Sequence, residues 1–115
     1  MKMEYMYLIR KGKVTDKFTV KIAKRFSERF MGLMGKTSLP DKEGLFFSNC
    51  NSIHCFFMKM PIDVIYLDKK YTVLDKETVQ PWHIGKIVHH AAHILELKEH
   101  DGDVIKTGDH MPISE

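Results

Sequence analysis

Cysteine is scarce in this chain of 115 residues, which contains only Cys50 and Cys55. Two cysteines are too few for the disulfide framework of a small secreted scaffold. Long apolar runs are also missing, because no stretch approaches the roughly 20 residues that a membrane span requires. The first residues carry early charges and lack the apolar run of a signal peptide. We therefore expect a cytoplasmic protein with reduced thiols and no membrane partner.

Neither sign of charge dominates, since 18 Lys and Arg stand against 15 Asp and Glu, for a formal net charge of +3. This bias is too weak to predict a nucleic-acid partner. The chain also lacks a glycine-rich phosphate loop, a Gly-x-Ser-x-Gly elbow and an aromatic RNA-binding motif. The sequence therefore does not predict nucleotide hydrolysis or serine-hydrolase chemistry.

The composition is that of a folded globular domain, with 43% apolar and 29% charged residues. A chain of this length suits one domain, here residues 1–115, and buries enough surface to fold without a disulfide, a metal or a cofactor. We expect none of these to be needed for folding.

Alternation of apolar and polar residues predicts several short strands. After a Lys11-Gly12-Lys13 turn, for example, Phe18, Val20 and Ile22 share one face of a half-buried strand. The expected strands cover residues 3–9, 17–22, 45–47, 53–58, 62–67, 71–79 and 111–113.

The spacing of the apolar residues changes from strand-like to helical at one place. Phe26, Phe30, Leu33 and Met34 have the spacing of the apolar stripe of a helix. Residues 87–97 fit either a helix or a strand, and the pattern alone leaves both open. The sequence thus predicts a mainly β fold, a compact antiparallel β-sandwich or barrel of about seven short strands with one short helix.

Three stretches together resemble a known family: Gly32-Leu33-Met34-Gly35, then IHCFFMKMPIDVIYLD at 53–68, then ILEL at 94–97 with Gly108-Asp109 behind it. The chain from about residue 26 to residue 113 is similar to the domain of unknown function 192 family, also called uncharacterised protein family 0127. The resemblance implies a small, mainly β domain of jelly-roll-like or barrel type and no established activity. It assigns the family motif to Gly32, Leu33, Met34, His54, Phe57, Met58, Asp63, Glu96, Gly108 and Asp109.

Two positions depart from the family pattern. Cys55 stands where the family often has Thr, and His83 where an Arg commonly follows Pro-Trp. The resemblance therefore implies no role for either residue.

His54 and Asp63 are polar residues inside apolar strands, and each has two interpretations. His54 is either a hydrogen-bonded core histidine or a ligand-binding one. Asp63 most simply caps backbone N–H groups of the turn at 59–61, or pairs with Arg25 or Arg29. As a partner of His54 it would instead fix a tautomer for acid–base or metal chemistry.

The remaining candidates are cysteine and histidine side chains. Cys50 would be a nucleophile only with a stabilised thiolate, and its spacing to His54 is not a standard zinc pattern. His89 and His93 lie four residues apart, which suits a metal on a helix, but an incidental histidine-rich loop is the simpler explanation.

We therefore predict a binding domain rather than an enzyme, which takes a small molecule or a protein partner in a cleft formed by His54, Met58, Asp63, Trp82 and His83. One alternative is a hydrolase-like or metal-dependent enzyme in which Cys50 or a metal-bound water attacks and His54 is the base. Another is a structural interaction domain with no active site. The oligomeric state stays open.

Overall fold

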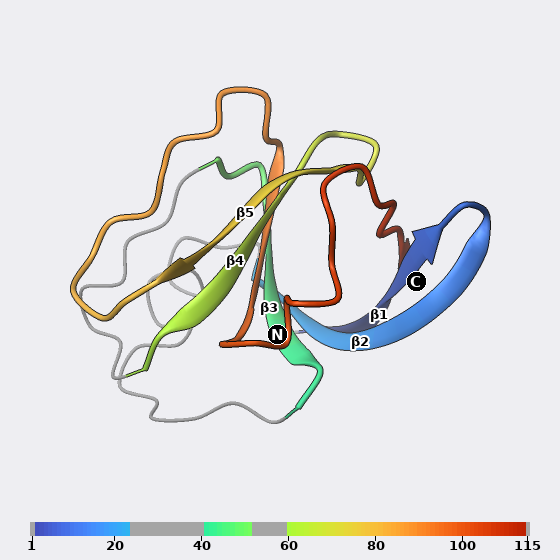
Figure 1. Cartoon of the computed structure of the whole chain (residues 1–115), viewed down its shortest axis with the longest axis horizontal. Coiled ribbons are helices and arrows are strands. Elements are labelled where there is room, and N and C mark those ends of the chain that lie inside the picture. Colours follow the sequence, from blue (N-terminus) through green and yellow to red (C-terminus); the bar gives the residue numbers. More distant parts are fainter. Residues whose placement is uncertain (1, 24–40, 52–59, 115) are drawn as a thin grey trace.

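The computed structural model describes residues 2–23, 41–51 and 60–114. Seven strands pair into one sheet (Figure 1). Their bounds are β1 Lys2–Arg10, β2 Lys13–Ala23, β3 Glu43–Ser48, β4 Ile62–Leu67, β5 Val73–Val79, β6 His93–Lys98 and β7 Ile113–Ser114. The mainly β prediction is confirmed, and the described residues contain no helix. None of them forms a helix long and apolar enough to cross a membrane.

The β1–β2 hairpin forms where the alternation predicts it. Lys11 and Gly12 occupy its turn with φ angles of 52° and 75°. Two successive positive φ values define the type I′ turn, whose twist matches that of paired antiparallel strands. Phe18, Val20 and Ile22 point to one buried face, as their spacing predicts.

The strand order is β5-β4-β6-β3-β2-β1-β7, and the chain therefore does not simply meander through the sheet. β3 pairs parallel with β2, whereas every other neighbouring pair is antiparallel. The prediction of an entirely antiparallel sheet is wrong at this pair. A parallel pair needs a long crossover connection, and residues 24–42 separate these two strands.

Both faces of the central strands are buried, since every residue of β4 is buried. One apolar cluster fills the first face, with members from strands β1 to β6 together with Ile105 and Met111. A second cluster fills the other face, with Leu45, Phe47, Ile62, Val64, Tyr66 and Ile94 at its centre. We call them the first and second clusters.

The ambiguous stretch at 87–97 resolves into a loop followed by a strand. Residues 87–92 lie in turns and irregular backbone, and β6 begins at His93. The strand interpretation of 93–97 is confirmed, because His93–Lys98 pairs with both β3 and β4. The predicted strand at 53–58 and the predicted helix around Phe26 to Met34 fall outside the described residues.

The edges of the sheet approach each other through His110, which forms isolated bridges with Ile9 of β1 and with Thr72 just before β5. The backbone N–H of Met111 also donates to the carbonyl of Tyr71 at 2.8 Å. These are single bridges rather than a ladder, so the sheet is not closed among the described strands, and the predicted sandwich or barrel is not confirmed.

Candidate functional site

Asp63 lies on β4 with its carboxylate buried beneath the turn that follows β6. Thr78 Oγ1, on the neighbouring strand β5, donates to Oδ1 at 2.8 Å. The backbone N–H groups of His100 and Gly102 donate to Oδ2 at 3.0 and 2.9 Å. Three donors therefore satisfy this carboxylate, as a buried anion requires.

The prediction that Asp63 caps the backbone N–H groups of a turn is confirmed, but the predicted turn is wrong. The carboxylate caps the turn at residues 99–102 rather than the one at 59–61, because β4 lies beside β6 in the sheet. Arg25 and Arg29, the predicted alternative partners, lie outside the described residues. Gly102 permits the close approach, since a Cβ there would lie 2.8 Å from Oδ2 of Asp63.

The other half of the predicted cleft lies outside the described residues. His54, Cys55 and Met58 lie outside the described residues, so a site around His54 stays a prediction. Cys50 is half-buried against the second cluster, and its N–H donates to the carbonyl of Ala92 at 2.9 Å.

Trp82 and His83 are both exposed on the loop between β5 and β6. The ring Nδ1 of His83 lies 2.9 Å from the carbonyl oxygen of Pro81, in its own loop. Neither residue contacts Asp63 through a hydrogen bond or ion pair in the described structure.

The two weak metal candidates have different surroundings. His89 is exposed in a turn, whereas the His93 ring stacks on Tyr71 with centroids 4.9 Å apart. His93 Nδ1 also accepts the N–H of Asn49 at 3.4 Å. Burial lowers the pKa of His93, although Asp68 acts in the opposite direction. Among residues 2–23, 41–51 and 60–114, no three His, Cys, Asp or Glu side chains converge to hold a metal ion.

Glu96 is the most unusual titratable group in the described structure. It lies in the middle of β6 between Leu45 of β3 and Val64 of β4, with 2% of its surface exposed. No described residue donates a hydrogen bond to its carboxyl group. Burial raises the pKa of Glu96 to about 8, so the group is mostly protonated at neutral pH.

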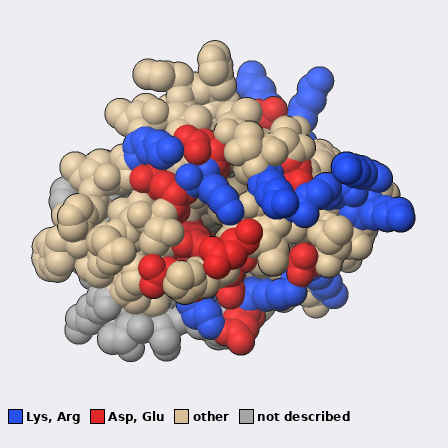
Figure 2. All heavy atoms as spheres, in the orientation of Figure 1, with Lys and Arg blue, Asp and Glu red and all other residues tan. Residues whose placement is uncertain are grey.

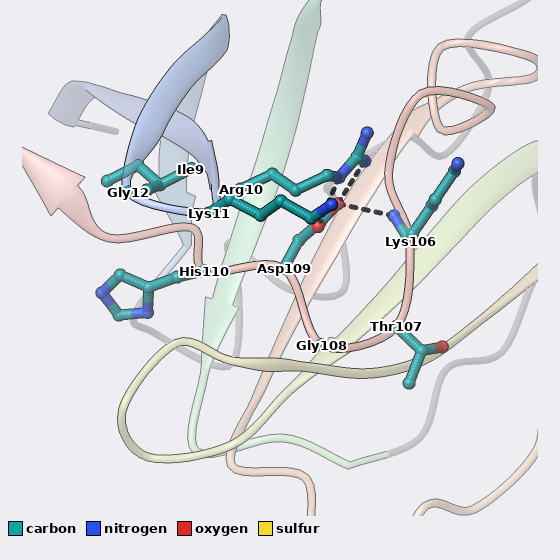
Figure 3. Close-up of a pocket in the computed structure, with 9 residues that line it drawn as sticks. All are labelled: Ile9, Arg10, Lys11, Gly12, Lys106, Thr107, Gly108, Asp109 and His110. Atoms are coloured by element: carbon teal, nitrogen blue, oxygen red, sulfur yellow. Dashed lines mark hydrogen bonds and ion pairs between the residues drawn. The ribbon is translucent and has the colours of Figure 1, made fainter.

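A cleft of about 430 Å³ lies between the β1–β2 turn and the segment that precedes β7 (Figure 3). We call it the Arg10 cleft. It is lined by Ile9, Arg10, Lys11, Gly12, Lys106, Thr107, Gly108, Asp109 and His110. Arg10, Lys11 and Asp109 extend toward the same region, whereas the His110 ring and Thr107 point away (Figure 3).

A bidentate ion pair fixes the floor of the Arg10 cleft. Arg10 Nε donates to Oδ1 of Asp109 at 2.8 Å, and Nη2 donates to Oδ2 at 2.7 Å. Nη2 also donates to the carbonyl of Val104, and the N–H of Lys106 donates to Asp109 Oδ2 at 2.8 Å. Asp109 is only 4% exposed. This geometry holds the guanidinium plane in one orientation.

The electrostatics of the Arg10 cleft favour an anion. Hydrogen bonding to Arg10 lowers the pKa of Asp109 and raises that of Arg10, so this pair stays ionised and internally balanced. The ammonium groups of Lys11 and Lys106 form no salt bridge within the described part of the chain, although the charge of Lys106 helps to lower the pKa of Asp109. The cleft therefore carries a net positive charge.

Sequence reasoning missed Arg10, Lys11 and Lys106 as site residues. The available signals were Gly108 and Asp109, which the family resemblance includes, and the basic turn at 11–13. Neither signal shows that residues 10 and 109 meet. Gly108 adopts a φ of 94°, which explains the glycine before Asp109.

Comparison with known proteins places these residues in a family. The family model DUF192, described as "Uncharacterized ACR", matches residues 7–113. The UPF0127 protein of Pyrococcus horikoshii is 38% identical over 101 residues, covering 76% of this chain and 85% of the relative. A Thermococcus kodakarensis relative is 35% identical over 75% of this chain and 62% of its own length. The aligned part spans about half of a third relative, from Thermococcus sibiricus, at 42% identity over 63% of this chain and 49% of the relative.

Two crystal structures share the fold. A proposed transcription regulator from Sinorhizobium meliloti 1021 superposes with a TM-score of 0.85 at 21% identity, covering 97% of this chain and 94% of the other. A protein of unknown function from Novosphingobium aromaticivorans gives a TM-score of 0.81 at 19% identity, covering 95% and 83%. At these identities the likeness concerns the fold alone. The family match, together with its curated relatives, shows that this chain belongs to the uncharacterised DUF192 family, whose curated members are named UPF0127 proteins.

Proposed function

We propose that this protein is a binding domain for a small anionic molecule, which it holds in the Arg10 cleft. One observation carries the proposal. A buried carboxylate fixes one cation at the floor of a cleft whose two further cations form no salt bridge among the described residues. Lys and Arg side chains also gather at the right of Figure 2, where the β1–β2 hairpin lies.

The remaining donors suit a phosphate monoester better than a neutral molecule. Asp109 and Val104 occupy Nε and Nη2 of Arg10, which leaves the N–H groups of Nη1 for a ligand. Lys11 and Lys106 line the same cleft, and their ammonium groups add two strong donors to it. Three cationic donors match the charge and the oxygen atoms of a dianion. Asp109 acts as a positioning residue, because it orients Arg10 rather than contacting the anion.

Calorimetric titration with glycerol phosphate tests the proposal. We expect saturable binding to the wild-type protein and none by glycerol, which lacks the phosphate. Lys106→Ala and Lys11→Ala should each weaken binding by about tenfold, the effect of losing one charge-assisted hydrogen bond.

Lys69→Ala is the matched control, because it removes one positive charge from the exposed turn after β4 without touching the cleft. It should leave the affinity unchanged. Equal loss of affinity in all three variants would mean that the anion responds to net charge alone, and absence of binding to the wild type would refute the proposal.

Two finer inferences accompany this function. We place the protein in the cytoplasm, in keeping with its few cysteines. We infer a barrel-like closure of the sheet, supported by the two bridges of His110. A ligand site at His54, Met58, Asp63, Trp82 and His83, and an enzyme that uses Cys50 with His54, both stay predictions. No contact among the described residues favours either of them.

A further inference from the structure

The segment of residues 106–112, here called the strap, lies between two strands that are not neighbours in the sheet. On one side it bonds to β1, where the N–H of Ile9 donates to the carbonyl of His110 at 2.8 Å and the N–H of His110 donates back at 3.1 Å. On the other side it bonds to the start of β5, since the N–H of Val73 donates to the carbonyl of Asp109 at 2.8 Å. The strap therefore joins β1 to the far end of the strand order.

The strap is held by separate contacts rather than by a continuous ladder. On the β5 side, the N–H groups of Gly108 and Met111 donate to the carbonyls of Val73 and Tyr71, each at 2.8 Å. The Met111 side chain is fully buried in the first cluster. After the strap, β7 is two residues long and pairs with β1 alone. A segment held in this way near the end of the chain opens more readily than a central strand such as β6, which is paired along both edges.

The Arg10 cleft is the joint between the strap and the β1–β2 hairpin. Its lining residues come from the hairpin end on one side and from the strap on the other. The ion pair of Arg10 with Asp109 crosses this joint, with contacts of 2.8 and 2.7 Å (Figure 3). Lys11 belongs to the hairpin and Lys106 to the strap. An anion that contacts both ammonium groups therefore requires the strap to be docked against the hairpin.

Docking of the strap concentrates positive charge in the cleft. Arg10, Lys11 and Lys106 all line it, and Asp109 is the one carboxylate among the lining residues. Mutual repulsion of these cations opposes docking, and a bound anion removes that repulsion. A ligand that binds the docked state and not the open state stabilises docking by mass action.

We infer that a bound anion holds the strap against the β1–β2 hairpin, and that the strap opens from β1 when the anion leaves. The inference rests on the proposed function and extends it, because it gives the anion control over a backbone segment that joins two parts of the sheet. The coupling is reciprocal. A change that opens the strap must also weaken anion binding, in proportion to the fraction of molecules that are open.

Hydrogen exchange of the full chain, followed by ¹H–¹⁵N NMR, measures strap opening at single amides. The reporters are the amides of Ile9, Val73, His110 and Met111, whose hydrogen bonds break when the strap opens. Without an anion, they should exchange faster than the amides of β6. Glycerol phosphate at about ten times its Kd should slow the reporters by about tenfold, which is the factor by which it lowers the open fraction.

Asp109→Asn removes one charge of the ion pair that crosses the joint. Without an anion, the reporters should exchange about tenfold faster or more in this variant. The amide of Ala92, which donates to the carbonyl of Leu67 before β6, should keep its rate. Asp41→Asn is the matched control, because it breaks the exposed ion pair of Asp41 with Lys98 and should leave the reporters unchanged.

Calorimetry on the same samples separates failure of this inference from failure of the proposed function. Saturable binding of glycerol phosphate with unchanged reporter rates would overturn the coupling and leave the proposed function standing. Absence of binding would refute both. Reporters that exchange only as slowly as the amides of β6 would also overturn the coupling, because the strap would then open only on global unfolding. The wild-type measurement decides these outcomes even if Asp109→Asn folds poorly.

Discussion

Replacing Glu96 with Gln is expected to stabilise the folded protein, and the gain should grow with pH. Glu96 is buried between Leu45 and Val64 without a described donor, and burial raises its pKa from 4.5 to about 8. Folding at neutral pH therefore takes up a proton that the unfolded chain does not hold. Gln has the shape of the protonated acid and needs no proton. At pH 8 the unfolding free energy of Glu96→Gln should exceed that of the wild type by roughly 3–5 kcal/mol.

The sign of the pH dependence follows from which state binds more protons. Between pH 4.5 and 8 the folded state holds the Glu96 proton and the unfolded state releases it, so stability falls as pH rises. His93 acts in the opposite direction below its ordinary pKa of 6.5, because burial lowers its pKa and the unfolded chain binds the proton more readily. In the interval from pH 6.5 to 8 the contribution of His93 fades, and Glu96 dominates the pH dependence. Wild-type stability should fall there by about 2 kcal/mol.

Urea denaturation at several pH values in this interval measures the effect. Glu96→Gln should give a nearly flat profile. Glu99→Gln, three residues further along and close to the surface, is the control and should keep the wild-type slope. A wild-type profile that is flat from pH 6.5 to 8 would contradict the assignment of a protonated Glu96 in the folded state.

Removing the Asp63 carboxylate should cost the fold roughly 3–5 kcal/mol. Asp63→Ala leaves the Thr78 hydroxyl and the backbone N–H groups of His100 and Gly102 without their acceptor. Each buried donor left unsatisfied costs about 1–3 kcal/mol. Asp63→Asn should cost less, since one acceptor oxygen remains while its NH₂ group meets a backbone donor.

Asp103→Ala is the matched control, because Asp103 lies in the same region of the chain but is exposed, and its carboxylate lies 3.3 Å from the His100 ring rather than at Asp63. It should change the unfolding free energy little. The Asn variant also separates the two interpretations of Asp63. A capping residue alters stability and leaves anion affinity unchanged, whereas loss of affinity in folded Asp63→Asn would support the ligand site predicted around His54.

Local patterns predicted the elements whose burial is decided by their own alternation. The β1–β2 hairpin follows directly from its apolar spacing and a turn glycine, whereas β4 follows from a short apolar run that is buried on both faces. The segment at 87–97 was ambiguous, because an apolar run fits a helix or a strand until its neighbours are known. Pairing with β3 and β4 decides that β6 is a strand.

The parts that could not be predicted depend on contacts between residues far apart in the chain. Arg10 and Asp109 are separated by 99 positions, and their pairing requires both the hairpin and the segment before β7 to be in place. Asp63 meets Gly102 only because β4 lies beside β6. Glu96 stands in an apolar run, and its strand register decides that it is buried within the second face rather than exposed.

Two-dimensional ¹H–¹⁵N NMR spectra recorded during titration with glycerol phosphate test most directly whether the Arg10 cleft is the binding site. The proposed function predicts saturable shifts that centre on the amide signals of Lys11, Gly12, Lys106 and Gly108. Half-saturation should need about tenfold more ligand in Lys106→Ala and the same amount in Lys69→Ala. Shifts that centre instead on Asp63 and the residues around Trp82, or no saturable shift at all, would contradict it.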